Sequence, residues 1–513
     1  MSGTGESCEG CPLVELKAGA AQHVPRSEWL LPALVGAVVW IIGAIERSFW
    51  LDEFHTLQHA RAAPWSEFFA SVSADNHPPL SFLLAKIARS LLGESELALR
   101  SWSILAGLAT VFLAARIGAR TACATSRAAL PWLVVLSSFA FNVFSEARMY
   151  GLLALATAGV IDSVLACLEG KRRHALVATW VAVGCHTHYY FAYELAALGL
   201  LGVGVWLRSA SARASVTRLF AAAALGVAAF VPWIVVGLAE QLANDLPSGG
   251  STGRYASFAG YVMSLGHLLF LNASLGGEWV SRYVALPGVC VGGLLGVLGF
   301  VRLARGARST SVCSRTSTAL FHLAWVSALV APAIGLCVAF VLPRAGFNWR
   351  YVAGALVPVL VFVAAGVRAK PWYRLALGGV LAATLALVLA VNVLSPGPEN
   401  FRGAFRYIAE HARAGDAMIV TPLQVFRGDE ALDGWDYYGP RVQRELGLDG
   451  STSPTLYQRG AFEGALEHER VWIYVRKRYE AHILAALRER YTYEEGTGVD
   501  DALSVYLFAD PRR

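Results

Sequence analysis

The stretch WLLPALVGAVVWIIGAI, residues 29–45, decides the broad class of this chain. It runs for 17 residues without a charged side chain, and a helix needs roughly 17–25 apolar residues to cross a bilayer. The run is too long for the core of a signal peptide, and no convincing cleavage site follows it. We therefore expect an uncleaved membrane anchor at this position.

Further apolar runs of spanning length follow along the chain. Together with the first they predict about eleven spans, which begin near Trp29, Leu97, Ala129, Met149, Ala175, Phe191, Leu219, Val284, Leu320, Tyr351 and Leu375. Residues 258–275 hold a further candidate, but Ser, Gly and His interrupt it, so an interfacial helix is an equal alternative. The composition agrees, because 56% hydrophobic and 16% charged residues are unlike a soluble enzyme. We predict a mainly α, polytopic transmembrane bundle of about 11–13 spans.

The basic residues predict how the bundle is oriented. If the N-terminal tail, residues 1–28, is cytoplasmic, every inner connection carries at least three Lys or Arg, as the positive-inside rule requires. These residues are Arg116, Arg120 and Arg127; Lys171, Arg172 and Arg173; Arg208, Arg213 and Arg218; Arg302, Arg305, Arg308 and Arg315; and Arg368, Lys370 and Arg374. An odd number of spans then places the C-terminal segment outside. We expect a multi-pass protein of the cell (inner) membrane, with residues 29–395 as its membrane domain.

Residues 396–513 have a different character. Ser395-Pro-Gly-Pro398 ends the last span. Helical periodicity over 401–414 and 478–491 alternates with apolar or alternating strands at 417–420, 471–475 and 502–508. The segment carries 19 acidic and 15 basic residues and no phosphate-binding glycine loop, so no nucleotide cofactor is expected. We predict a small extracytoplasmic α/β domain and, because the Lys and Arg residues follow membrane topology, no nucleic-acid partner.

The first exterior loop, residues 46–96, carries the candidate chemistry. Asp52 and Glu53 lie a few residues beyond the first span, at the outer interface. One carboxylate of such a pair can accept a proton from a hydroxyl, and either can hold a ligand hydroxyl or a metal ion. Loops that leave a membrane often carry acids, so the pair alone does not decide between these roles. Pro78-Pro79 precedes a predicted helix, Leu80 to Leu92, on which Lys86 can either pair with a lipid phosphate or reach toward headgroups.

Three motifs in this loop resemble a known family. Trp50-Leu-Asp-Glu53, Asn76-His-Pro-Pro79 and Ser95-Glu-Leu-Ala-Leu-Arg100 resemble the bacterial branch of the dolichyl-phosphate-mannose-protein mannosyltransferase family. That branch is itself similar to the aminoarabinose and galacturonate transferases that modify lipopolysaccharide. Further matches follow in the same order: Ser145-Glu-Ala-Arg-Met-Tyr-Gly151, His186-Thr-His-Tyr-Tyr-Phe191, Asn348-Trp-Arg-Tyr351, and Phe401-Arg-Gly-Ala-Phe-Arg-Tyr407 with Gly415-Asp416. The resemblance covers most of the chain and is strongest over residues 49–191.

The resemblance implies a GT-C type membrane enzyme. Such enzymes take a hexose or pentose from a polyprenyl-phosphate carrier and pass it, with inversion, to a hydroxyl of lipid A or lipopolysaccharide, a cell-surface glycan or a protein. Asp52 would be the general base, and Glu53 would orient the sugar or the acceptor. Glu146 would orient the acceptor or complete a metal site with Asp52 and His77, although the need for a divalent metal ion stays open. The lipid phosphate would bind Lys86, Arg350 and, more weakly, Arg148, and the remaining lining would be His77, Tyr150, His188 and Tyr351.

Two other classes of protein compete with this interpretation. A transporter or flippase binds its substrate near the bilayer midplane, often between two related halves. Here the ionisable residues gather at one surface and no half-repeat is present, which favours an interfacial enzyme. A sensor or scaffold with an outer recognition domain would need neither Asp52 nor Lys86.

Overall fold

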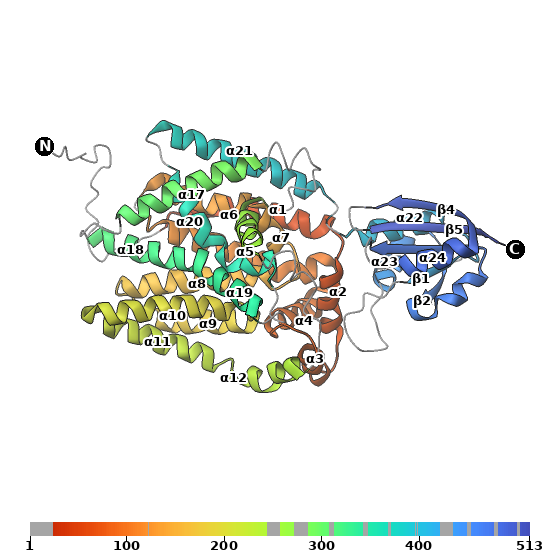
Figure 1. Cartoon of the computed structure of the whole chain (residues 1–513), viewed down its shortest axis with the longest axis horizontal. Helices are drawn as coiled ribbons and strands as arrows, with labels where there is room; N and C mark the ends of the chain where they lie inside the picture. The colour runs from red at the N-terminus through yellow and green to blue at the C-terminus, as the bar shows by residue number, and fades with distance from the viewer. Residues whose placement is uncertain are drawn as a thin grey trace.

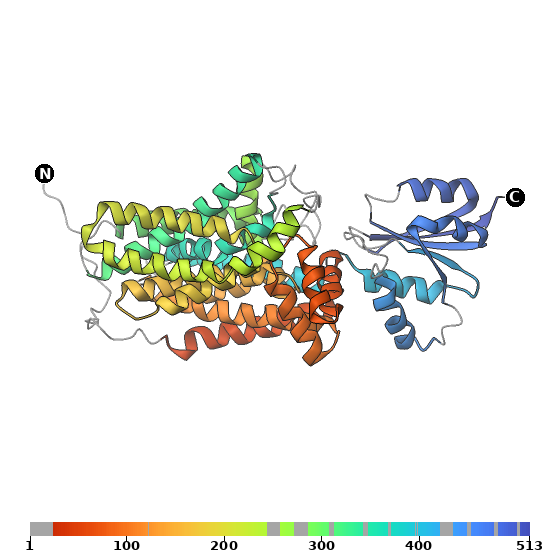
Figure 2. The same ribbon diagram turned by 90° about the horizontal axis from the view of Figure 1, so that it is seen from below.

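The computed structural model describes most of the chain. The described residues are 24–121, 123–243, 257–270, 286–306, 312–341, 347–367, 371–395, 397, 399–420, 434–448, 453–476, 481–499 and 503–512. They form a long helical bundle and, at one end of it, a separate α/β domain (Figure 1). The same division is plain when the molecule is turned by 90° (Figure 2).

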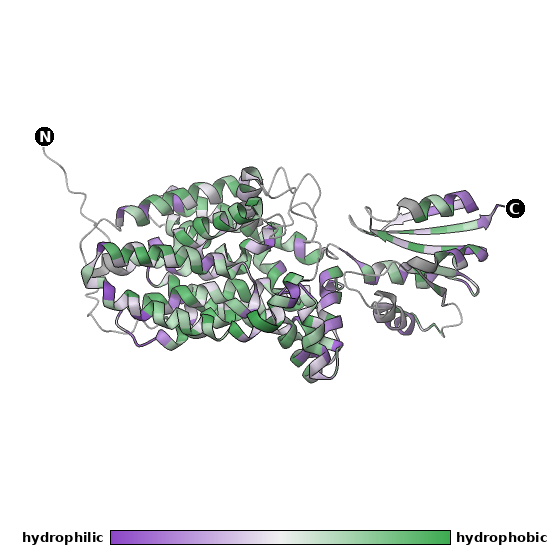
Figure 3. Ribbon diagram, turned by 60° about the horizontal axis from the view of Figure 1, so that its bottom comes forward, coloured by the Kyte–Doolittle hydropathy of each residue, from purple (hydrophilic) through white to green (hydrophobic). Residues whose placement is uncertain are grey.

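Nine helices among the described residues are long and apolar enough to cross a membrane. Six are single helices: α1 (Arg26–Glu46), α5 (Glu96–Gly118), α8 (Tyr150–Leu168), α10 (Phe191–Arg208), α17 (Leu286–Gly306) and α21 (Trp372–Leu394). The other three are compound segments. Ala210–Ala243 contains α11 (Arg213–Ala228), Thr316–Val341 contains most of α18 (Val312–Trp325) and all of α19 (Ala331–Val341), and Trp349–Gly366 contains α20 (Leu356–Gly366). Most residues of the bundle helices are hydrophobic, as the colouring of the ribbon shows (Figure 3). The prediction of a mainly α, multi-pass membrane protein is confirmed.

Two predicted spans differ from a straight membrane helix. The pair α6 (Ala124–Leu136) and α7 (Ser138–Phe144) bends by 59°, because Ser137 takes an extended backbone and its hydroxyl accepts a hydrogen bond from Ala140 N. Helix α9 (His174–Thr187) has 14 residues, which at 1.5 Å per residue is about 21 Å long. The ambiguous stretch near residue 258 forms α15 (Phe258–Phe270), and its predicted end at 275 lies outside the described residues.

The loop between α1 and α5 folds into three short helices at the end of the bundle that faces the α/β domain (Figure 1). They are α2 (Leu51–Arg61), α3 (Trp65–Ser73) and α4 (Leu80–Leu92). Helix α4 has the predicted bounds. Its outer face, together with that of α3, leaves large apolar side chains exposed at Trp65, Phe69, Ile87, Leu91 and Leu92.

The C-terminal domain is a five-stranded mixed sheet with helices. Its elements are α22 (Phe401–His411), β1 (Ala417–Val420), α23 (Gly434–Glu445), β2 (Thr455–Gln458), η8 (Arg459–Glu467), β3 (Arg470–Arg476), α24 (Ala481–Arg490), β4 (Tyr491–Gly498) and β5 (Leu503–Pro511). The strand order is β2-β1-β3-β5-β4, with β1 parallel to β2 and β3. The predicted α/β character is confirmed. Strands β2 and β4 were not predicted, because both are edge strands with largely exposed side chains and no apolar alternation.

Candidate active site

The N-terminus of α2 presents two adjacent acids in opposite environments. Asp52 keeps 32% of its side chain exposed, whereas the side chain of Glu53 is fully buried. Neighbouring residues on a helix point about 100° apart, because 3.6 residues make a turn. The helix therefore separates the two carboxylates that the sequence places side by side.

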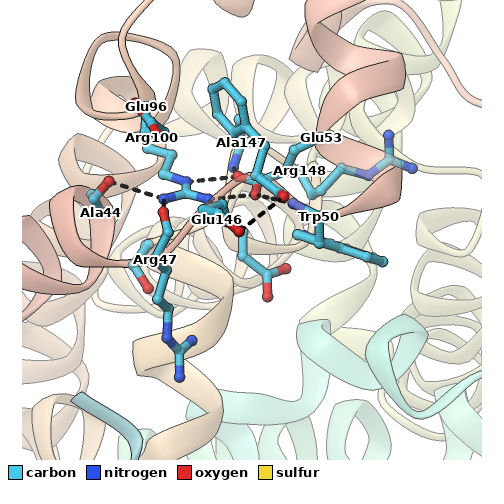
Figure 4. Close-up of polar contacts among 12 residues, drawn as sticks. Ala44, Arg47, Trp50, Glu53, Glu96, Arg100, Glu146, Ala147 and Arg148 are labelled. Carbon is cyan, nitrogen blue, oxygen red and sulfur yellow. Dashed lines mark hydrogen bonds and ion pairs between the residues drawn. The ribbon is translucent and has the colours of Figure 1, made fainter. Parts of the chain in front are cut away.

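Glu53 is held inside the bundle by Arg100 of α5. Arg100 Nε donates to Oε1 at 2.7 Å and Nη2 to Oε2 at 2.5 Å, and Ala147 N donates to Oε1 at 2.7 Å. The remaining guanidinium N–H groups bind the carbonyl oxygens of Ala44, Arg47 and Ser48. Figure 4 shows this network converging on the carboxylate. Both oxygens of Glu53 are thus engaged, and the geometry favours a positioning role over the predicted contact with sugar or acceptor.

Asp52 faces the guanidinium of Arg148. The distance from Arg148 Nη2 to Asp52 Oδ2 is 3.8 Å. Nη1 of Arg148 also donates to the carbonyl oxygen of Asp52 at 3.0 Å and to Thr56 Oγ1 at 3.3 Å. Burial opposes the charge of Arg148, but Asp52, Tyr150 and Asp75 together outweigh it and raise the pKa of the guanidinium above its ordinary value. Arg148 therefore stays cationic beside Asp52.

Glu146 and Arg350 form a second, looser pair. Glu146 Oε1 lies 3.6 Å from Arg350 Nη2, and Oε2 has no hydrogen-bond partner among the described residues. Burial raises the pKa of Glu146, and Arg350 opposes this only in part. The guanidinium carbon of Arg350 lies 4.0 Å from the centre of a ring of Trp50 and 4.7 Å from that of Trp349. Because Trp50 is close to Asp52 in the sequence, this contact places Arg350 against the segment that carries Asp52.

A wall of aromatic and histidine rings borders these charges. The ring centres of Tyr150 and Tyr351 are 6.3 Å apart, those of His188 and Tyr351 are 4.9 Å apart, and those of His77 and His188 are 5.4 Å apart. His188 Nδ1 accepts a hydrogen bond from Tyr190 N at 3.1 Å. Burial lowers the pKa of His188 well below its ordinary value, so the ring is neutral and its proton lies on Nε2. That buried N–H has no hydrogen-bond partner among the described residues.

Asp75 was not assigned a role from the sequence, yet it fixes His77. Its Oδ1 lies 3.1 Å from His77 Nδ1 and its Oδ2 lies 2.8 Å from His59 Nε2. Burial alone would raise the pKa of Asp75, but hydrogen bonds from both histidines hold it well below its ordinary value. The spacing Asp75-Asn-His77 was the available signal, and the partner His59 lies too far away in sequence to be recognised.

Lys86 is buried against the connection between α2 and α3. Its Nζ donates to the carbonyl oxygen of Ala62 and lies 5.2 and 5.3 Å from the ring centres of Trp65 and Phe68. No carboxylate of a described residue forms an ion pair with it. These contacts are with the residue after α2 and with α3, so the structure does not bring Lys86 into the Asp52–Arg148–Arg350 cluster.

The sequence left open a metal site made of Asp52, His77 and Glu146. In the part of the chain that the structure describes, no group of three or more His, Cys, Asp or Glu side chains is arranged to hold a metal ion. His77 is instead bonded to Asp75, and Glu146 lies against Arg350. Asp52, His77 and Glu146 therefore do not fit a metal site in this arrangement.

Comparisons with known proteins give matches only among solved structures. No protein-family model and no curated protein matches the chain. ArnT from Cupriavidus metallidurans, bound to undecaprenyl phosphate, is similar at 14% identity and a TM-score of 0.41, over 95% of this chain and 100% of that one. The oligosaccharyltransferase of Archaeoglobus fulgidus is 11% identical with a TM-score of 0.48, over 75% of this chain and 58% of that one. The arabinofuranosyltransferase AftD from mycobacteria is 13% identical with a TM-score of 0.47, over 94% of this chain and 40% of that one. None of these likenesses assigns an activity to this chain.

Proposed function

We propose that this protein is an integral membrane glycosyltransferase that moves a sugar from a polyprenyl-phosphate carrier to an acceptor hydroxyl outside the cytoplasm. One observation supports this most strongly. Asp52, Glu146, Arg148 and Arg350 come from three different family-like motifs, and they meet at the end of the bundle beside the C-terminal domain. A partly exposed carboxylate beside Arg148, with Arg350 stacked on the nearby Trp50, suits a lipid-borne anionic donor and a polar acceptor.

Asp52 is the general base in this mechanism. Of the three acids in the cluster, Glu53 has both oxygens bonded, and Glu146 is buried with a raised pKa. Asp52 is the partly exposed acid of the three, and no described residue donates a hydrogen bond to its carboxylate, which lies beside Arg148. The acceptor oxygen attacks the anomeric carbon while its proton passes to Asp52, and the bond from that carbon to the phosphate oxygen breaks with its electron pair. Attack on the face opposite the phosphate inverts the anomeric centre.

The two arginines stabilise the departing lipid phosphate. Negative charge grows on the phosphate oxygen as the bond breaks, and fixed cations near that oxygen lower the barrier. Arg350 is held flat by the rings of Trp50 and Trp349, which leaves its N–H edge to grip phosphate oxygens in a two-point contact. Lys86 donates to Ala62 O and contacts none of these groups, so it has no part in the proposed phosphate contact.

Membranes containing the wild-type protein, Asp52→Asn or Glu67→Gln test this proposal. Each sample receives radiolabelled polyprenyl-phosphate sugars one at a time, and label is followed into lipid, glycan and protein fractions. Glu67 is an exposed acid on α3, so Glu67→Gln is the matched control. We expect transfer by the wild-type and control proteins and a loss of at least ~100-fold in Asp52→Asn. Equal transfer by all three would remove Asp52 as the base. Transfer by none of them would favour a transporter.

A further inference from the structure

The segment that carries Asp52 is bonded directly to the C-terminal domain. Phe49 N donates to Tyr438 Oη at 2.6 Å, and Leu51 N donates to Glu399 Oε2 at 2.9 Å. Ser48 Oγ donates to the carbonyl oxygen of Glu399 at 2.7 Å. Three hydrogen bonds therefore tie residues 48–51 to residues that follow the last membrane helix.

The Glu399 contact is made at the start of α2. Leu51 is the first residue of that 11-residue helix, and the first N–H groups of a helix have no partner within it. A carboxylate at this end satisfies one of them and interacts favourably with the helix dipole. Asp52 is the next residue, so the Leu51 hydrogen bond limits where its side chain can move.

Apolar packing surrounds these hydrogen bonds. The ring centres of Phe54 and Phe401 are 5.6 Å apart, and those of Phe49 and Tyr437 are 5.2 Å apart. Phe49, Phe54 and Phe401 belong to one buried cluster that also includes side chains from one face of the C-terminal sheet. Phe49 and Phe54 thus pack into this cluster, whereas Glu53 between them is held by Arg100 of the membrane bundle and Asp52 remains partly exposed.

Tyr438 connects the two halves of this arrangement. Its hydroxyl accepts from Phe49 N and donates to Glu96 Oε1 at 3.0 Å. Glu96 begins α5 and also pairs with Arg402. One turn further along the same helix, Arg100 holds Glu53. The start of α5 therefore restrains the Asp52 segment through Arg100 directly and through Glu96 by way of the C-terminal domain.

We infer that the C-terminal domain is a positioning element of the active site, in which Tyr438 and Glu399 restrain residues 48–54 and so place Asp52 against Arg148. This inference rests on the proposed function for its catalytic consequence. A domain that served only as an outer recognition module would have no need to bond the backbone of this segment.

Hydrogen–deuterium exchange and transfer kinetics, measured on the full-length protein, test the inference together. Tyr438→Phe removes the hydroxyl that joins Phe49 to Glu96, and Glu399→Ala removes the carboxylate at Leu51. Glu399→Gln retains an oxygen that can accept from Leu51 N, so its exchange rate and kcat should lie between those of Glu399→Ala and the wild type. Tyr491→Phe is the matched control, because its buried hydroxyl donates to His468 O at 2.7 Å within the C-terminal domain. A similar melting temperature for the control and Tyr438→Phe shows that the domain stays folded.

For Tyr438→Phe and Glu399→Ala we expect about tenfold faster exchange in peptides covering residues 48–56. We also expect kcat to fall about tenfold while KM for the donor changes less than about twofold. Unchanged exchange, or faster exchange with an unchanged kcat, would overturn the inference. Exchange needs no donor, so faster exchange in a protein that transfers no sugar would refute the proposed function while supporting the restraint on residues 48–54.

Discussion

Arg148 approaches Asp52 mainly through the backbone: its Nη1 donates to the carbonyl oxygen of Asp52 at 3.0 Å, whereas its Nη2 stays 3.8 Å from the carboxylate. A distance of 3.8 Å is too long for a hydrogen bond. The cation therefore anchors the residue and attracts its carboxylate without occupying the oxygens that would accept a proton.

Replacing Arg148 should impair transfer more than it impairs folding. Arg148→Gln removes the positive charge beside Asp52 and the anchor on its backbone, so we expect kcat to fall about 100-fold. Arg89→Gln is the control, because Arg89 pairs with Glu94 on a partly exposed face of α4. The measurement is steady-state transfer at saturating donor. An Arg148→Gln protein with a normal kcat would show that this cation contributes nothing to the reaction.

Substitution of Glu53 should lower the stability of the protein, whereas substitution of Asp52 should abolish transfer. Glu53→Gln leaves Arg100 buried without a countercharge, and breaking a buried ion pair costs about 3–5 kcal/mol. We therefore expect a clear fall in the melting temperature in detergent and poor expression. Asp52→Asn, at a partly exposed position, should melt near the wild-type temperature and lose transfer. A stable Glu53→Gln protein without activity would instead make Glu53 a catalytic residue.

The raised pKa of Glu146 predicts a pH-dependent stability. Burial favours the protonated acid in the folded state, whereas the unfolded chain titrates near its ordinary value of 4.5. Below that value Glu146 is protonated in both states and does not affect the free energy of unfolding. The free energy of unfolding falls as the pH rises from that value to the higher pKa of the folded protein, and the loss is complete above it. Glu146→Gln cannot ionise, so the melting temperature of the variant minus that of the wild type should increase with pH between the two pKa values and stay constant at higher pH. A difference in melting temperature that does not change with pH would contradict a raised pKa of Glu146 in the folded protein.

Arg350 should depend on its shape as well as its charge. Arg350→Lys keeps a cation but loses the flat guanidinium that stacks on Trp50 and Trp349. We expect KM for the polyprenyl donor to rise roughly tenfold, with a smaller change in kcat, and a greater loss for Arg350→Gln. Donor titration in membranes measures both values. Equal behaviour of the lysine variant and the wild type would exclude a two-point phosphate contact.

Much of the fold could be predicted because the bilayer makes it depend on local sequence. Every predicted span begins on a described helix or within two residues of one, as with Val284 and α17 at Leu286. Helix α4 is also local: Pro79 fixes its start and Gly93, with a φ of 86°, its end. Glycine adopts this left-handed backbone more readily than other residues.

The partners within the site could not be predicted in the same way. Asp52 and Glu53 are equivalent in sequence, and only the position of Arg100, 47 residues away, buries one of them. Glu399 lies 348 residues from Leu51, and no periodicity encodes such a contact. The motifs indicated which residues carry the chemistry, but folding determines which of them touch a substrate and which hold others in place.

The orientation in the membrane gives the last prediction. The proposed reaction needs Asp52 and the C-terminal domain on the extracytoplasmic side, which the clustered Lys and Arg residues favour. Glu495 on β4 and Ser211 between α10 and α11 are both exposed, and they should lie on opposite sides. In spheroplasts, a membrane-impermeant maleimide should label Glu495→Cys at once and Ser211→Cys only after permeabilisation. The wild-type protein is the control that measures labelling of the native cysteines. The reverse pattern would place the site in the cytoplasm and refute transfer to an extracytoplasmic acceptor.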